Sequence, residues 1–456
     1  MLTELRDRLV RLAADYGEIH VENWSTTRIV YANQSVDSVS TSRTSSGNVR
    51  VLSNGGWGFA SFNEPDFGRY LLAAQENASL VGRRRGGEVT GIRKLGTPVT
   101  DTIVTSCEIQ PSAWSLEQKN DLARRYNELL QHPRIASTRV TYMDWQVEKL
   151  FANTEGSMIR QVKTFAGVAF GGMARDGTNV QQAFESVGQY GGMELVTGHE
   201  ERVEAAKKRA LDLLDAKKLE SGSYRVLLDP NLAGVFIHEA FGHLSEADFL
   251  HENPKMQEVM VLGRRFGPDF LNVIDDGSIP GLAGYTPYDD EGVPARRNWL
   301  IREGRLTGRL HSRETAGVMR EELTGNARAV GAGYQPIVRM TNTFIDRGSK
   351  SFEELLSTID DGVYAIDYLG GMTNLEMFTF SAGHAYRVRN GKICELLRDV
   401  VLSGNVFTTL GDIAAVGDDL EHFGGLGGCG KAGQGGLPVS TGSPHIVVND
   451  VLIGGV

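Results

Sequence analysis

The sequence YRVLLDPNLAGVFIHEAFGHLSEAD, from Tyr224 to Asp248, is the part of the chain that most constrains its fold. The apolar run from Tyr224 to Leu228 is typical of a buried strand. Asp229 followed by Pro230 is typical of a helix start, with an N-cap residue and then proline at the first helical position. The pattern therefore predicts a helix from Leu232 to Leu244 that is apolar enough to be buried.

Three residues of this predicted helix can carry chemistry: His238, Glu239 and His243. Burying them costs free energy unless a partner satisfies them. A metal is such a partner, because neutral imidazoles bind Zn²⁺ and a neighbouring carboxylate can accept a proton from water. The usual zinc-peptidase spacing is H-E-x-x-H. Here the histidines are one residue further apart, which leaves them ~140° apart on an ideal helix.

Both imidazoles can reach one ion only if the helix widens into a π-bulge or ends at this point. Gly242, just before the second histidine, makes such a distortion inexpensive. By residue type and spacing alone, a metal site and two unrelated, hydrogen-bonded core histidines fit the pattern equally well.

A catalytic zinc ion usually has three protein ligands and one open position, so a third ligand is needed. Cys429 is the best candidate, because it lies in the glycine-rich segment GGLGGCGKAGQGG (424–436), where core packing explains a cysteine poorly. Cys107 and Cys394 are predicted to be buried for packing. The other candidates for the third ligand are Glu246, Asp248, His251 and His422.

The length of 456 residues is expected to form more than one domain. The sequence pattern predicts an α+β protein with its main domain boundary at Ser221. Region 1–221 is predicted to contain antiparallel sheets with flanking helices, and to divide into two subdomains near 85–110. Region 222–456 is predicted to be β-rich and to carry the histidine helix. Within it, Glu303-Gly304 and Asn390-Gly391 are typical hairpin turns.

Several elements of the first region have local signatures. An antiparallel meander is predicted from Ile19 to Phe62, with breaks at Asn33, Gly47 and Gly55-Gly56. Ser115 and Gln118 form a capping box at the start of a helix. Further elements are two strands over 138–153 and 158–170, and a helix over 201–220 with Val203, Ala206, Ala210 and Leu214 facing inward.

Composition limits the possible partners and compartments. The formal net charge is −10, which disfavours direct nucleic-acid binding, since phosphate backbones require clustered Lys and Arg. Three scattered cysteines do not form a disulfide framework. No run approaches ~18 apolar residues, so no membrane span is expected. A cytoplasmic location is the prediction.

Four motifs, in order along the chain, resemble the TldD/PmbA family. They are HEAFGHLSEAD (238–248), DDEGVPARRNWLIREG (289–304), MTNTFID (340–346) and GGCGKAGQ (427–434). The resemblance covers nearly the whole chain. Members are described as zinc-dependent peptidases and as modulators of DNA gyrase. The TldD kind carries H-E-x-x-x-H and a C-terminal cysteine ligand, whereas the PmbA or TldE kind lacks the metal motif.

This sequence keeps His238, Glu239, His243 and Cys429, so it resembles the metal-binding kind, although 426–430 is richer in glycine than the family pattern. The resemblance implies one Zn²⁺ per active subunit, held by the two histidines and the cysteine, with Glu239 as general base and no other cofactor. It also implies a homodimer, or a heterodimer with a metal-free paralogue, and a confined passage that admits unfolded peptides.

The expected function is therefore the hydrolysis of peptides by metal-activated water. Two alternatives remain open. One is a non-catalytic partner or modulator protein with a structural metal, against which the glutamate beside His238 argues, because a structural site needs no base. The other is a hydrolase of small amides, because a His-His-Cys zinc site with an adjacent glutamate also suits formyl-amide hydrolysis.

Overall fold

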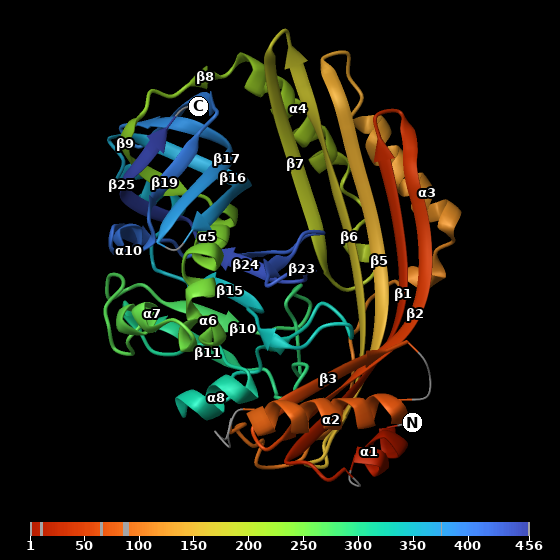
Figure 1. The fold of residues 1–456 in the computed structure, drawn as a ribbon. Coiled ribbons are helices and arrows are strands. Elements are labelled where there is room, and N and C mark those ends of the chain that lie inside the picture. The colour runs from red at the N-terminus through yellow and green to blue at the C-terminus, as the bar shows by residue number, and fades with distance from the viewer. Residues whose placement is uncertain (1, 10–11, 64–66, 85–90, 375, 455–456) are drawn as a thin grey trace.

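The computed structural model describes residues 2–9, 12–63, 67–84, 91–374 and 376–454. Figure 1 shows two halves side by side: a tall sheet of long strands with its helices, and a β-rich half that ends at the C-terminus. The mixed α+β class is as predicted. Within the described residues, no helix is both long and apolar enough to cross a membrane.

One seven-stranded sheet forms the first half, in the order β3-β2-β1-β5-β6-β4, with β7 also paired to β6. Neighbouring strands are antiparallel except β4, which runs parallel to β6. Strands from both sides of 85–110 belong to this sheet, and residues 85–90 lie outside the described residues. The strands are β1 (Tyr16–Ala32), β2 (Ser35–Ser53), β3 (Gly56–Phe62), β4 (Thr100–Val104), β5 (Ile135–Asn153), β6 (Met158–Asp176) and β7 (Asn179–Tyr190).

The meander predicted from Ile19 to Phe62 is confirmed as β1, β2 and β3, and two of its three breaks are turns. Asn33 has a positive φ of 56° between β1 and β2, and Gly55 has one of 76° between β2 and β3. The break predicted at Gly47 is wrong, because this glycine continues β2. A Cβ there would lie 2.3 Å from Cζ of Phe62, so the glycine is needed for close packing rather than for a turn.

Helices flank the sheet: α1 (Leu2–Leu9), α2 (Gly68–Arg84), α3 (Leu116–Leu129) and α4 (Glu200–Asp215). The predicted capping box is confirmed, since Ser115 and Gln118 each accept the other's backbone N–H. The inward face predicted for α4 is also confirmed, because all four of its residues are buried. The helix ends five residues before the predicted Glu220, and β8 (Lys217–Lys218) follows.

The second half contains a small closed barrel and an open sheet. The barrel strands are ordered β16-β9-β25-β19-β17, and β16 also pairs with β17, which closes the ring. These strands and their neighbours are β9 (Gly222–Leu228), β16 (Asp361–Asn374), β17 (Met377–Arg389), β18 (Lys392–Arg398), β19 (Val401–Asn405), β20 (Ile413–Val416) and β25 (Ile446–Gly454).

The open sheet has the order β12-β11-β10-β15-β24-β21, and two short hairpins accompany it. Both predicted turns are confirmed: Glu303-Gly304 joins β11 to β12, Asn390-Gly391 joins β17 to β18, and all four residues have positive φ. The strands are β10 (Val273–Asp276), β11 (Arg297–Arg302), β12 (Arg305–Leu306), β13 (Ala327–Arg328), β14 (Ile337–Val338), β15 (Asn342–Ile345), β21 (Glu421–Phe423), β22 (Cys429–Lys431), β23 (Gln434–Leu437) and β24 (Ser440–Ser443).

The helices of this half are short. They are α5 (Pro230–Ile237), α6 (Ala247–His251), α7 (Pro254–Val259), α8 (Arg313–Met319), α9 (Phe352–Ser357) and α10 (Val406–Gly411). In Figure 1, β23 and β24 lie on the side of this half that faces the long strands of the first. The glycine-rich segment just before β22 packs directly on β7, where a Cβ on Gly188 would lie 2.8 Å from the carbonyl carbon of Gly425. The two halves therefore meet close to Cys429.

Candidate metal centre

The site is built on the helix that follows β9. Asp229 caps α5, and its carboxylate accepts the backbone N–H of Leu232 at 2.9 Å, with Pro230 at the first helical position. The predicted helix start is therefore confirmed. Burial, together with the charge of Asp367, raises the pKa of Asp229 to about 7.

The helical segment changes its winding at the histidines. Instead of one helix from Leu232 to Leu244, α5 ends at Ile237, a π turn covers His238–Gly242, and a 3₁₀ turn covers His243–Ser245. The N–H of His243 bonds to the carbonyl of His238, five residues back. This wider turn brings both imidazoles to one side of the segment, with ring centroids 5.3 Å apart and planes at 82°.

Gly242 belongs to this π turn for reasons of space. Its φ of −57° is helical, so no left-handed conformation requires glycine here. A Cβ at this position would lie 2.0 Å from Sδ of Met340, which is itself fully buried. The absence of a side chain therefore lets the π turn lie against the open sheet.

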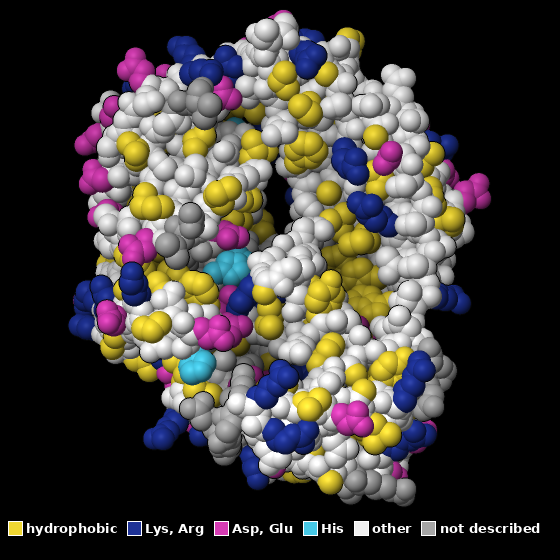
Figure 2. Space-filling view, in the orientation of Figure 1, with side chains coloured by type: hydrophobic (Ala, Val, Ile, Leu, Met, Phe, Trp, Pro, Cys, Tyr) yellow, Lys and Arg dark blue, Asp and Glu magenta, His cyan; other side chains and the backbone are white. Residues whose placement is uncertain are grey.

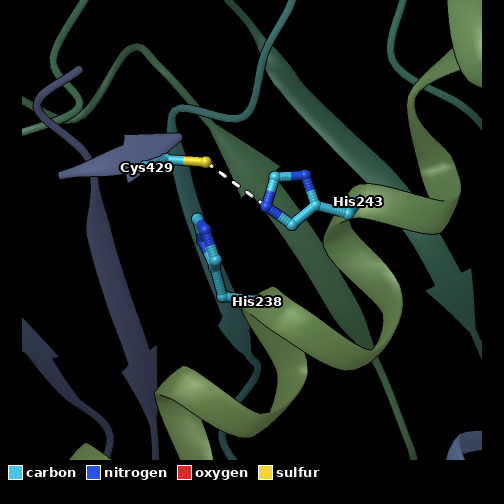
Figure 3. A group of neighbouring side chains, drawn as sticks. All are labelled: His238, His243 and Cys429. Atoms are coloured by element: carbon cyan, nitrogen blue, oxygen red, sulfur yellow. Dashed lines mark hydrogen bonds between the residues drawn. The ribbon is translucent and has the colours of Figure 1, made fainter. Parts of the chain in front are cut away.

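Cys429 approaches the histidines from β22, far along the chain. Its Sγ lies 3.3 Å from Nε2 of His243, a residue 186 positions away. One possible ligand atom from each of His238, His243 and Cys429 lies within 4.8 Å of the other two. Figure 3 shows the three side chains pointing toward one common space, two from the helical segment and one from the hairpin.

The electrostatics of the cluster favour a thiolate. Burial alone would raise the pKa of Cys429, but hydrogen bonds with His238 and His243 lower it to about 5. Burial would likewise lower the pKa of His243, but its contacts with Cys429 and Glu246 raise it to about 10. The cysteine therefore carries the charge that a metal ligand needs.

Two residues outside the predicted set hold the cluster in place. The Arg339 guanidinium is fully buried and donates to the carbonyls of Cys429 at 2.6 Å and Gln434 at 3.1 Å, which fixes the hairpin of β22 and β23. Lys431 donates to Asp248 and lies 3.1 Å from Glu246. Arg339 directly precedes the MTNTFID motif, which is the only sequence feature that singles it out.

Within the described structure, none of the alternative third ligands joins the cluster of His238, His243 and Cys429. Glu246 contacts His243 through Nδ1, at 3.0 Å, on the side of the ring away from Cys429. Asp248 binds Lys431, His251 is exposed, and the ring of His422 packs against Phe344.

The other two cysteines also lie apart from the cluster. Cys107 is half-buried. The prediction that Cys394 is buried is wrong: it is exposed, because the first residues of β18 lie beside the hairpin turn, beyond the core.

Glu239 lies on the π turn, next to His238, and is half-buried. Within the described residues, its carboxylate forms no hydrogen bond and no ion pair. Its charge is felt by Tyr368 of β16, whose pKa is raised by burial and then by Glu239. The arrangement thus combines two imidazoles and a thiolate with a carboxylate that is free to accept a proton.

Comparison with known proteins identifies the family. Three family models match consecutive parts of the chain: PmbA/TldA metallopeptidase domain 1 over residues 17–79, the central domain over 109–214 and the C-terminal domain over 221–455. A metalloprotease from Synechocystis is 44% identical over 445 residues, which cover 97% of this chain and 95% of that protein. A metalloprotease from Methanothermobacter thermautotrophicus is 35% identical, with 100% and 98% covered.

Solved structures share the fold. A proposed modulator of a DNA gyrase from Thermotoga maritima matches over 100% of both chains with a TM-score of 0.80 at 23% identity, a likeness that concerns the fold alone. The two relatives that match over nearly their whole length are metalloproteases, and on that basis this protein is a metalloprotease. The chain belongs to the PmbA/TldD metallopeptidase family.

Proposed function

We propose that this protein hydrolyses peptides or unfolded polypeptide at one zinc ion per chain, held by His238, His243 and Cys429. The observation that carries the proposal is the convergence of these three donors. Ligand bonds of ~2.0–2.1 Å to nitrogen and ~2.3 Å to sulfur place tetrahedral donors ~3.3–3.8 Å apart. The contact of 3.3 Å lies in this range, and the widest separation, within 4.8 Å, exceeds it by about 1 Å.

The donor chemistry also suits zinc. Imidazole and thiolate are its common protein ligands, and three of them leave a position open for water. The Nδ1 atom of His238 is buried without a hydrogen-bond partner among the described residues, as in a ring whose partner is an ion or water. One relative, a TldD homologue from Saccharolobus solfataricus, is named a zinc metalloprotease, which supports the choice of metal.

The mechanism assigns a role to each side chain. A zinc ion at such a site, when bound, polarises the scissile carbonyl and lowers the pKa of water toward ~7. Glu239, whose carboxylate has no hydrogen-bond or ion-pair partner in the described part of the chain, takes a proton from the attacking water and later delivers it to the leaving amine. Glu246 accepts the Nδ1 proton of His243, which turns Nε2 toward the ligand position.

Two substitutions test these roles in the purified full-length chain. Glu239→Gln is expected to keep its metal and to lower the rate of digestion of a reduced, alkylated polypeptide by ~10²–10⁴-fold, the usual contribution of a general base. Cys429→Ser is expected to lose the metal, measured by elemental analysis, whereas Cys394→Ser, at an exposed cysteine, serves as the control. A chelator should abolish digestion, and added zinc should restore it.

Each opposite result has a definite meaning. Undiminished digestion by Glu239→Gln would remove the glutamate from the mechanism. Full metal occupancy in Cys429→Ser would reassign the third ligand. Cleavage of a formyl-amide, with peptides left intact, would replace the peptide substrate by a small amide.

We also propose that the chain works as a dimer, with a second copy or with a metal-free paralogue of the TldE kind. The support is one open sheet edge. β2 pairs with β3 only from Gly47 onward, and Ser35 to Ser45, with Val36 and Val39 among them, is exposed. A solved TldE from Thermococcus kodakarensis matches this fold with a TM-score of 0.77 at 17% identity. Native mass spectrometry, alone and with the paralogue, tests the proposal.

The proposed division of the chain is 1–221 and 222–456, with the second part as the catalytic domain. The start of the C-terminal family model at residue 221, and of β9 at Gly222, supports this boundary. Separate expression of 222–456, followed by metal analysis, tests whether the second part folds and binds metal alone.

A further inference from the structure

A cavity of about 230 Å³ lies where the two halves of the molecule meet. Its wall on the sheet side is aromatic, formed by Trp24, Trp145 and Tyr190, and Trp145 lies 5.1 Å from Trp24 and 5.6 Å from Tyr190 between ring centroids. Figure 2 shows the molecule hollowed between the halves, with hydrophobic side chains on the sheet side of the hollow. On the other side, the cavity is lined by Leu437 and Pro438, and the ion pair of Lys149 and Asp290 also lines it.

This cavity is separate from the metal cluster but close to it. Leu437 lies on β23, and its partner across the hairpin is Cys429 of β22. The cavity wall at Leu437 and the proposed thiolate ligand therefore lie on neighbouring strands. A molecule bound in the cavity would need to extend only past the hairpin of β22 and β23 to reach the metal cluster.

Lys163 of β6 lines the cavity and has no counterion among the residues that the structure describes. The residue is 5% exposed, and its Nζ lies 5.1 Å from the centroid of the Tyr190 ring. Within the described residues, it forms no hydrogen bond and no ion pair. Neighbouring Lys149 differs, because it pairs with Asp290 at 2.8 Å and Glu22 at 3.0 Å.

Arg328 adds a second charge to the same cavity. It is 4% exposed and donates to the carbonyls of Met340 and Pro438, at 2.6 and 2.8 Å, but to no carboxylate among the described residues. Burying a cation without an anionic partner costs several kcal/mol of folding free energy. The presence of two such cations at the wall of a cavity therefore indicates a ligand that supplies the anion. Burial, with repulsion from Lys149 and Arg328, lowers the pKa of Lys163 to about 7, in keeping with a missing counterion.

Size and chemistry define this ligand. The volume is below the ~300–1,000 Å³ of most cofactor and drug-sized pockets, so the cavity accommodates a single large residue. The walls require an apolar or aromatic group, and the two cations require an anion attached to it. An apolar amino-acid residue with a free α-carboxylate combines both features.

We propose that this cavity binds the C-terminal residue of a peptide, with its α-carboxylate at Lys163 and Arg328 and its side chain against Trp24, Trp145 and Tyr190. In naming a peptide as the ligand, the proposal rests on the proposed peptidase function. It defines the preferred substrate class as chains that end in an apolar or aromatic residue with a free carboxylate.

Calorimetric binding to the full-length Glu239→Gln variant tests the proposal without turnover. The probes are N-acetyl-leucyl-phenylalanine, its C-terminal amide and N-acetyl-phenylalanine. The acid is expected to bind at least about tenfold tighter than the amide, since a charge-assisted hydrogen bond is worth ~1.5–3 kcal/mol. If N-acetyl-phenylalanine binds tightly and N-acetyl-leucyl-phenylalanine does not, the ligand of the cavity is a small carboxylic acid and the proposal of a peptide is overturned.

Lys163→Met, introduced into the Glu239→Gln variant, should reduce the affinity for the acid to that for the amide and leave the affinity for the amide unchanged. Lys255→Met, at an exposed lysine, should leave the preference intact. Lys163→Gln is a second variant that removes the charge while keeping a polar group. Equal binding of acid and amide, no binding of either, or a preference that survives both Lys163 variants would overturn the proposal.

The two proposals fail separately. If the protein binds the acid more tightly than the amide but digests no peptide, the proposed hydrolytic function is rejected and the proposed anion site is supported. If the protein digests peptides efficiently but binds the acid and the amide equally well, the proposed anion site is rejected and the hydrolytic function is supported.

Discussion

At the scale of single residues, Lys163 is a cation whose burial opposes folding. Its neighbours are of both signs: Lys149 and Arg328 repel it, whereas Asp290 and Glu22 attract it without contact. Its pKa of about 7 in the folded chain lies below the 10.5 of a free lysine. The folded state therefore binds fewer protons than the unfolded state between these two values, and stability rises with pH across that window.

Lys163→Met should accordingly stabilise the ligand-free protein below pH 7, by about 2–5 kcal/mol, because both states of the wild type are protonated there and the whole burial cost is present. The gain should shrink between pH 7 and 10.5 and vanish above it. The melting-temperature difference between variant and wild type, followed from pH 6 to 10 beside Lys255→Met, measures this. A difference that stays constant with pH would show that the charge of Lys163 is not its cause, and a less stable variant would show that Lys163 supports the fold.

At the scale of elements, the π turn is the feature that brings the two histidines of the candidate metal centre together. Gly242→Ala places a Cβ 2.0 Å from Sδ of Met340, so either that side chain or the turn has to move. Movement of the turn separates the two imidazoles, and metal content is expected to fall several-fold. Gly411→Ala on α10 is the matched control, because a Cβ there meets nothing within 4 Å.

A second substitution tells whether contact with Met340 is the cause. Met340→Ala in the Gly242→Ala background removes the obstructing sulfur and should restore part of the metal content, measured as the zinc-to-protein ratio. An unaltered ratio in Gly242→Ala alone would show that the turn tolerates a side chain.

The elements that sequence reasoning predicted correctly depend on local chemistry. Asp229-Pro230 starts a helix, Ser115 and Gln118 cap one, and Asn390-Gly391 turns a hairpin, each through contacts within a few residues. Closure of the barrel through β16 and β17 could not be predicted in this way, since which strands become neighbours depends on the whole half. The polar β7 (Asn179–Tyr190) was missed, because its sequence lacks a clear apolar alternation.

The candidate site was partly accessible from the sequence for a similar reason. The five-residue spacing of the histidines requires a widened or interrupted helix, and the π turn is that widening. The position of Cys429 beside His243, 186 residues away, depends on the packing of the hairpin and on Arg339, which no local pattern reveals.

At the scale of the whole molecule, buried ion pairs join the two halves. The DDEG stretch of the second half meets the first sheet through Arg50, which lies 2.7 Å from Glu18 and 3.0 Å from Glu291. A second pair links Lys149 to Asp290. The cavity at Lys163 and the glycine-rich segment before Cys429 lie at the same junction, so its integrity affects both proposed binding sites.

Arg50→Met tests how far the junction supports the molecule. The substitution leaves Glu18 and Glu291 buried without their cation, which should destabilise the chain by about 3–5 kcal/mol. Thermal unfolding measures the loss, and hydrogen exchange should localise it to residues 289–293. Arg50→Lys keeps the charge and should lose less. A melting temperature of Arg50→Met equal to that of the wild type would show that the halves are held together by their apolar contacts instead.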